Sequence, residues 1–196
     1  MNSTVKDKYK AIVIGASAGG MKALTLLLSS LPEGFPLPIL IVQHQHPNQD
    51  DFYIHYYSEQ CKLKVKEAEG KEFVKSGVVY FAPPNYHLLI EEDRSILLSI
   101  DEKVNYSRPS IDVLFESASD VYRSELIGII LTGANNDGSK GVSRIESNGG
   151  LTIAQDPATA EYPVMPQSAI NTVGVDYILP LEKIPDKLIE LIMKNK

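Results

Sequence analysis

The sequence predicts an α/β fold of three layers, α/β/α, in which helices cover both faces of a mainly parallel sheet. Short runs rich in Ile, Val and Leu alternate with amphipathic stretches of helical length. The apolar runs lack a regular alternation with polar residues, which is typical of strands buried on both faces. The 196 residues suffice for one core of this kind and no linker divides them, so residues 1–196 are expected to form a single domain.

The first strand and helix are predicted at about residues 11–14 and 21–31. The turn between them, residues 15–19, spells Gly-Ala-Ser-Ala-Gly and matches the G-x-S-x-G pattern of a nucleophile elbow. Small neighbours let such a turn expose a serine above the sheet, so Ser17 is a candidate nucleophile. Two alternatives stay open: Ser17 caps the helix, or the glycines hold a nucleotide, although their spacing does not fit G-x-G-x-x-G.

Two later strands also lead into residues suited to chemistry. The strand at 38–42 is followed by His44, and the strand at 126–132 leads through a loop to Asp137 and a helix at 139–147. Parallel strands place their carboxyl ends at one edge of the sheet, where α/β proteins hold their ligands. Each residue also has a simpler, structural explanation. A histidine at a strand end is usually just a polar residue that leaves the sheet, and an Asp-Gly pair often forms an Asx turn or a helix cap.

Together, the three residues form the minimum set for nucleophilic acyl transfer. A serine hydroxyl reacts poorly until a base removes its proton, and His44 would be that base. Asp137 would fix the tautomer of the imidazole and stabilise its protonated form. Backbone N–H groups would bind the oxyanion, and the candidates are those of Ala18, Ala134 and Asn135.

Residues 77–100 interrupt the alternation and predict a β-hairpin insertion that walls the cleft. Its expected strands are residues 78–81, 88–90 and 96–98, separated by turn-forming residues. His87 lies in this insertion, and a structural role as a half-buried histidine is preferred for it over a catalytic one.

The C-terminal part is expected to contain a strand at 151–154, a turn-rich span over 153–170, a strand at 177–179 and a helix at 181–193. The turn-rich span either borders the site or crosses the surface. Arg108 either clamps a substrate carboxylate or caps the helix that begins near Ser110.

Composition argues against several other classes of protein. The net charge is −6 without a basic cluster, so no nucleic-acid partner is expected. No run approaches the roughly 18 apolar residues of a membrane span, so no membrane insertion is expected. The single cysteine, Cys61, and the lack of an apolar signal segment predict a cytoplasmic protein. His44 and His46 lack a third ligand at recognisable spacing, so no metal site is expected.

Several motifs, taken in order, resemble the catalytic domain of the CheB-type chemoreceptor protein-glutamate methylesterases nearly end to end. They are residues 14–20, Gln43-His44 with Pro47, residues 80–83 with His87, residues 108–115, residues 131–133 with Asp137-Gly138, residues 154–156 and residues 165–170. The resemblance implies hydrolysis of glutamate methyl esters on cytoplasmic chemoreceptor helices, with release of methanol, and in several members deamidation of glutamine. It places the catalytic roles on Ser17, His44 and Asp137 without metal or cofactor. The span containing Met165 is expected to border the site, and both Met165 and Arg108 are candidates for substrate binding.

Some positions depart from the family pattern around the expected mouth of the cleft. They are Ala18, Ala134-Asn135, Gln45-His46 and Val164. These departures bear on substrate identity more than on reaction type. The alternative is a weakened family member that binds receptor or signalling helices as an interaction module.

Many family members carry an N-terminal receiver domain that controls access to the site. Only residues 1–10 precede the first expected strand, whereas a receiver needs roughly 120 residues. If residues 1–196 are the full protein, control is expected to come from a separate regulatory protein or from abundance; if they are an excised domain, the inhibitory surface has been removed with the rest.

Overall fold

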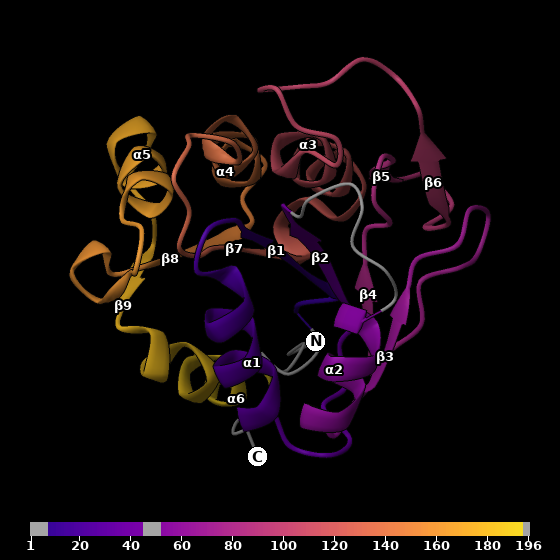
Figure 1. The fold of residues 1–196 in the computed structure, drawn as a ribbon, viewed down its shortest axis with the longest axis horizontal. Helices are drawn as coiled ribbons and strands as arrows, with labels where there is room; N and C mark the ends of the chain where they lie inside the picture. The colour runs from indigo at the N-terminus through magenta and orange to yellow at the C-terminus, as the bar shows by residue number, and fades with distance from the viewer. Residues whose placement is uncertain (1–7, 45–51, 194–196) are drawn as a thin grey trace, which may run out of the picture.

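The computed structural model describes residues 8–44 and 52–193, and its centre is a parallel sheet of seven strands (Figure 1). The strands are β1 (Ala11–Ala16), β2 (Ile39–Gln43), β3 (Lys64–Glu67), β4 (Val78–Phe81), β7 (Leu126–Ile130), β8 (Leu151–Gln155) and β9 (Tyr177–Leu179). Their order across the sheet is β3-β4-β2-β1-β7-β8-β9. The chain therefore first forms β2, β3 and β4 on one side of β1 and afterwards forms β7, β8 and β9 on the other side. Such a reversal leaves a crevice at the carboxyl ends of the strands beside it.

Helices cover both faces of the sheet, which confirms the three predicted layers (Figure 1). One face carries α1 (Gly20–Ser30), α2 (Phe52–Gln60) and α6 (Ile184–Met193); the other carries α3 (Ile111–Tyr122), α4 (Ser139–Ser147) and α5 (Val164–Thr172). Single-turn 3-10 helices lie at Arg123–Glu125, Pro157–Thr159 and Leu181–Lys183. The last of these replaces the first turn of the helix expected at 181–193.

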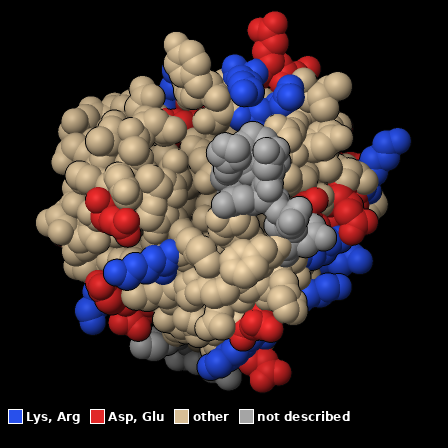
Figure 2. Space-filling model, viewed as in Figure 1, with Lys and Arg blue, Asp and Glu red and all other residues tan. Residues whose placement is uncertain are grey.

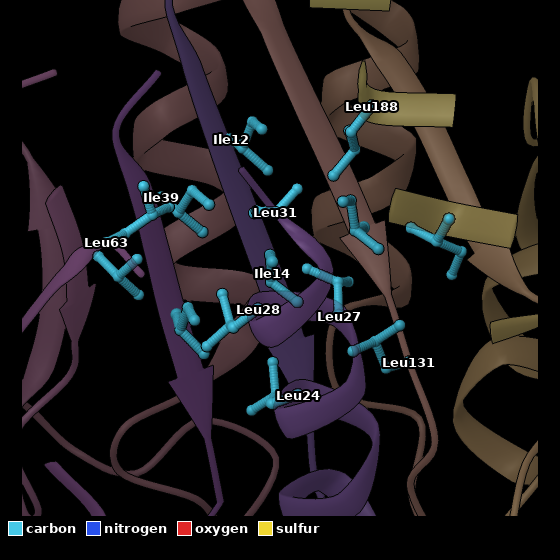
Figure 3. Packing of buried hydrophobic residues seen from close by; sticks show 14 of the residues in the cluster. Ile12, Ile14, Leu24, Leu27, Leu28, Leu31, Ile39, Leu63, Leu131 and Leu188 are labelled. Atoms are coloured by element: carbon cyan, nitrogen blue, oxygen red, sulfur yellow. The ribbon is translucent and has the colours of Figure 1, made fainter. Parts of the chain in front are cut away.

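Successive side chains of the central strands enter the two cores alternately. In β1, Ile12 and Ile14 pack in the core beneath α1, whereas Val13 lies in the core beneath α3. Buried leucines of α1 and of its C-cap recur at helical spacing and lie over the sheet in Figure 3; they are Leu24, Leu27 and Leu28 in the helix and Leu31 at its C-cap. Burial on both faces explains why the strand sequences are continuously apolar.

The predicted β-hairpin insertion is present, although it has two strands. β5 (His87–Ile90) and β6 (Ile96–Ser99) pair antiparallel and form a separate sheet beside α3. Residues 78–81, expected as a third strand of the insertion, instead form β4, which pairs parallel with both β2 and β3. The side chains of Val79, Tyr80 and Phe81 are buried, and only the interior of the main sheet offers burial on both faces.

No helix within the described ranges combines the length and the apolar composition required to cross a bilayer. Figure 2 shows acidic and basic side chains intermingled around the edge of one face, whose visible centre is mainly uncharged.

Candidate active site

Three neighbouring strands, β2, β1 and β7, place the sequence-predicted site residues at one edge of the sheet. Ser17 directly follows β1, and His44 directly follows β2. Backbone hydrogen bonds continue beyond the strands: the N–H of His44 donates to the carbonyl of Ala16 over 3.0 Å, and the N–H of Ser17 donates to the carbonyl of Thr132 over 3.0 Å. The sheet itself therefore fixes the spacing between these residues.

The side chains of Ser17, His44 and Asp137 form a continuous hydrogen-bonded chain. His44 Nδ1 lies 3.2 Å from Ser17 Oγ, and His44 Nε2 lies 2.9 Å from Asp137 Oδ2. Because the carboxylate can only accept, it selects the tautomer with the proton on Nε2. The lone pair of Nδ1 then remains available to accept the proton of the serine hydroxyl.

Ser17 does not cap α1. The helix begins at Gly20 with Gly19 as its N-cap, and it has no side-chain cap hydrogen bond at this end. Gly19 has φ 76°, a conformation that favours glycine, and a Cβ there would lie 3.0 Å from Thr132 Oγ1. The glycine thus lets the chain turn just beyond Ser17, and the serine hydroxyl is directed to His44 instead of to the helix.

Asp137 is completely buried and is surrounded by hydrogen-bond donors. The donors are Ile111 N at 2.7 Å, Ser110 Oγ at 2.8 Å, Asn105 Nδ2 and His44 Nε2 at 2.9 Å, Gly138 N at 3.1 Å and Asp112 N at 3.2 Å. Burial alone would raise the pKa of this carboxyl. The hydrogen bonds, led by that from His44, outweigh burial and hold the pKa of Asp137 below its ordinary value.

Two of these donors are the first backbone amides of α3, so Asp137 binds the positive end of a helix other than the one it precedes. The alternative of a cap for its own helix does not agree with this arrangement. Gly138 is the N-cap of α4, and the side chain that accepts from an amide of its first turn is that of Asp112, from Gly141 N at 2.8 Å. The carboxylate is thereby prevented from rotating away from His44.

Ser110 and His87 support Asp137 from the side of the hairpin. Ser110 is the N-cap of α3, but its hydroxyl bonds Asp137 instead of its own helix. The N–H of Ser110 donates to His87 Nδ1 over 3.2 Å, and His87 Nε2 lies 3.0 Å from the carbonyl of Glu102. His87 is 1% exposed, so it has the expected structural role but is fully buried.

Asn105 joins two buried carboxylates, and sequence reasoning missed it. Its single Nδ2 donates to Asp112 Oδ2 over 2.8 Å and to Asp137 Oδ1 over 2.9 Å. Burial raises the pKa of Asp112, and the nearby charge of Asp137 adds to this, against a hydrogen bond from Gly141 N that lowers it. Asp112 and Ser110 belong to a motif visible in the sequence, whereas Asn105 carries no local signal.

The three proposed oxyanion donors have free backbone N–H groups. Within residues 8–44 and 52–193, the amides of Ala18, Ala134 and Asn135 donate to no protein acceptor. Asn135 also places its side chain beside the base: its Oδ1 accepts from the N–H of Asp137 at 3.1 Å, and its Nδ2 lies 3.4 Å from His44 Nδ1.

Arg108 lies beside the site, but its guanidinium does not cap the helix. Nη1 donates to the carbonyls of Ile100 and Asp101, over 2.7 and 2.9 Å. Its buried Nε has no acceptor in the described part of the chain. Arg108 thus braces the loop after the hairpin, and the first amides of α3 donate to Asp137 instead.

Met165 lies in α5 beneath the loop that follows β7, and its substrate contact stays a prediction. Its side chain is completely buried in α5, and its N–H donates to the carbonyl of Gly133 over 3.0 Å. A Cβ on Gly133 would lie 2.5 Å from Met165 Cε, so the two residues are tightly packed. Met165 supports the loop that carries Ala134 and Asn135 from beneath.

A pocket of about 190 Å³ opens beside His44. It is lined by His44, Asn85, Lys103, Tyr106, Ser107, Arg108 and Pro109. Elsewhere in residues 8–44 and 52–193, no group of three His, Cys, Asp or Glu side chains is arranged to hold a metal ion. Gln45 and His46 lie outside the described residues.

Known proteins match this chain along most of its length. The family model for the CheB methylesterases matches residues 12–188. A Leptospira interrogans protein, provisionally named a protein-glutamate methylesterase/protein-glutamine glutaminase, is 56% identical over 187 residues, which are 95% of this chain and 97% of that protein. The Thermotoga maritima protein-glutamate methylesterase/protein-glutamine glutaminase is 40% identical over 186 residues, which are 93% of this chain but 54% of that protein.

The crystal structure of the Thermotoga maritima CheB methylesterase catalytic domain matches the fold with a TM-score of 0.89 and 40% identity. The match covers 93% of this chain and 98% of that chain.

Proposed function

The chain belongs to the CheB methylesterase family, and we propose that its Ser17, His44 and Asp137 hydrolyse glutamate methyl esters on the cytoplasmic helices of chemoreceptors. One observation carries this proposal. The hydroxyl of Ser17 lies 3.2 Å from a ring nitrogen whose partner nitrogen is bonded to a buried carboxylate. This is the arrangement that activates serine for acyl transfer.

In the proposed reaction, Ser17 Oγ attacks the ester carbonyl while His44 Nδ1 takes its proton. Collapse of the tetrahedral intermediate expels the methoxy group, which receives that proton and leaves as methanol. Water then attacks the glutamyl ester on Ser17 while His44 takes its proton; collapse of this second intermediate breaks the ester bond, returns the proton to Ser17 Oγ and frees the receptor's glutamate side chain as a carboxyl group. Asp137 stabilises the protonated imidazole in both halves.

The oxyanion is proposed to bind the free N–H groups of Ala18 and of Ala134 or Asn135. Each well-placed donor of this kind contributes about 3 kcal/mol to lowering the barrier. A side chain at position 18 does not change a backbone donor, so the departures from the family pattern are compatible with the chemistry. A glutamine side chain would follow the same path and release ammonia, as the names of the relatives suggest.

Arg108 is proposed to contribute to substrate binding because it lines the pocket beside His44. The proposed place of action is the cytoplasm, where the receptor helices carry their methyl esters.

The test is methanol release from methylated receptor cytoplasmic domains. Ser17→Ala should abolish release while leaving the protein folded by circular dichroism. Ser29→Ala is the matched control, because its hydroxyl bonds only the carbonyl of Leu26 within α1. Ammonia release from receptors carrying glutamine measures the second activity. If the folded wild type releases no methanol from several receptor types, the proposal is wrong, and an interaction module that binds receptor helices becomes the better interpretation.

A further inference from the structure

The segment between the hairpin and α3 contains a two-residue turn of an unusual kind. Val104 and Ser107 exchange both backbone hydrogen bonds, over 3.1 and 2.9 Å. Between them, Asn105 has φ 50° and Tyr106 has φ 64°. Positive φ at both central positions is the signature of a type I′ turn, which strongly prefers Asn followed by Gly.

Asn suits the first position for a reason given by its contacts, because its amide bonds Asp112 and Asp137. Tyr106 has no comparable reason. A residue with a Cβ is strained at this φ, and the side chain of Tyr106 is 95% exposed, so no packing within the chain offsets the strain. Folding alone would favour glycine here.

The position of the turn suggests why a tyrosine is present. Tyr106 lines the same pocket as His44, together with the cationic side chains of Lys103 and Arg108. The neighbouring Asn105 ties the turn to Asp137, so the backbone that carries the tyrosine is fixed relative to the reacting groups. An exposed aromatic ring on a fixed backbone is well suited to contact a partner at low entropic cost.

We propose that Tyr106 is a specificity-determining residue that contacts the polypeptide substrate next to the reacting glutamate. This inference rests on the proposed function and identifies a part of the substrate. The ring would bury an apolar side chain that lies one helical turn from the esterified glutamate, since residues three or four apart share a helix face. A small ester without that neighbour would lose this contact.

Three substitutions distinguish the effect of the aromatic ring from the effect of the backbone strain at position 106. Tyr106→Gly removes both, Tyr106→Ala removes the ring but keeps a Cβ at positive φ, and Tyr106→Phe keeps the ring. If the tyrosine served folding, Tyr106→Gly would lower the unfolding temperature. We expect an unfolding temperature equal to or higher than that of the wild type for Tyr106→Gly, and a lower one for Tyr106→Ala than for Tyr106→Gly.

Activity toward the methylated receptor domain should depend on the presence of the ring and not on the backbone strain. For both Tyr106→Gly and Tyr106→Ala, KM for the methylated receptor domain should rise about ten-fold, the loss typical of removing one well-buried aromatic contact. The ratio of kcat/KM for the receptor domain to kcat/KM for a small glutamate γ-methyl ester should fall by a similar factor. Tyr106→Phe should keep most of this preference. Phe73→Ala is the matched control, because Phe73 is an exposed aromatic residue outside the pocket.

Binding provides a readout that does not depend on turnover. In a Ser17→Ala background, adding Tyr106→Gly should raise the Kd for the methylated receptor domain about ten-fold. An unchanged Kd and an unchanged kcat/KM ratio, in a protein whose wild type releases methanol, would overturn this inference and leave the proposed function intact. A wild type that neither releases methanol nor binds the receptor domain would overturn both.

Discussion

Replacing Asn105 tests how far the buried carboxylates depend on one shared donor. Asn105→Gly keeps the positive φ but removes the hydrogen bonds of 2.8 and 2.9 Å to Asp112 and Asp137. Hydrogen bonds to charged groups contribute about 1.5–3 kcal/mol each, or about 3–6 kcal/mol together. Because Asn105 is only half-buried, water would bond the two carboxylates in its place and restore part of this energy. We therefore expect a loss of about 2–4 kcal/mol in the free energy of unfolding.

Asn105→Asp provides the contrasting perturbation, because it places a third carboxylate between the two existing ones. At neutral pH it should destabilise the protein more than Asn105→Gly does. Proximity to two acids raises the pKa of the introduced carboxyl, so its destabilising effect is present at neutral pH and diminishes as the pH falls and it gains a proton.

The assay is urea unfolding at pH 7 and pH 5, supported by thermal unfolding. For a chain of 196 residues, a loss of 1 kcal/mol lowers the unfolding temperature by about 2–4 °C. The loss expected for Asn105→Gly therefore corresponds to a fall of about 4–16 °C. The rate of methanol release should also fall by about ten-fold or more, because Asp137 would hold His44 less firmly. The reasoning is refuted if Asn105→Gly lies within about 0.5 kcal/mol of the wild type, or if Asn105→Asp is the more stable variant at pH 7.

Three further predictions concern the surroundings of the same carboxylate and the loop before it. Ser110→Ala removes the 2.8 Å hydrogen bond to Asp137 and should cost about 1.5–3 kcal/mol in urea unfolding, whereas a cost near zero would show that water replaces it. Gly133→Ala brings a Cβ within 2.5 Å of Met165 and should cost about 1–3 kcal/mol, and a double-mutant cycle with Met165→Ala should show non-additive coupling. Since the folded pKa of Asp137 is depressed, its stabilising contribution is present above the unfolded pKa of about 3.9 and is lost as the pH falls through the folded value. The difference in unfolding free energy between wild type and Asp137→Asn should therefore shrink only below about pH 4, and a difference that shrinks already at pH 6 would contradict the assigned direction.

The parts of the structure that the sequence predicts are those with a repeated or local physical signal. Buried parallel strands leave continuous apolar runs, and their ends are marked by polar residues, so the sheet and the positions of Ser17, His44 and Asp137 follow from pattern alone. Pattern could not decide between β4 as part of the hairpin and β4 as part of the main sheet, since both require the same apolar residues. β3 (Lys64–Glu67) was not predicted, because three of its four residues are charged, as suits an exposed edge strand.

The residues that hold the site together were harder to predict. Asn105 acquires its role only because the turn that carries it lies against the start of α3, and no local sequence property reveals that contact. Arg108 and Met165 remain predictions for substrate binding. The structure adds that backbone carbonyls engage Nη1 of the first and that the side chain of the second is buried, and neither contact was foreseen. Asn105 and Met165 contact Asp137 and Gly133, which are distant in the sequence. Arg108 bonds carbonyls only seven and eight residues away, but the path of the loop that brings them together leaves no local pattern in the sequence.

The strand order also determines when, during synthesis, the chain can become chemically competent. β1 and β2, which lead into Ser17 and His44, emerge from the ribosome first. Thr132, whose carbonyl accepts from the N–H of Ser17, and Asp137 both follow β7, and Asp137 lies 93 residues beyond His44. Until β7 inserts next to β1, the imidazole has no carboxylate to orient it. We therefore expect a nascent chain that ends before β7 to turn over esters far more slowly than the 196-residue chain, and the appearance of full turnover would report that the two halves of the sheet have joined.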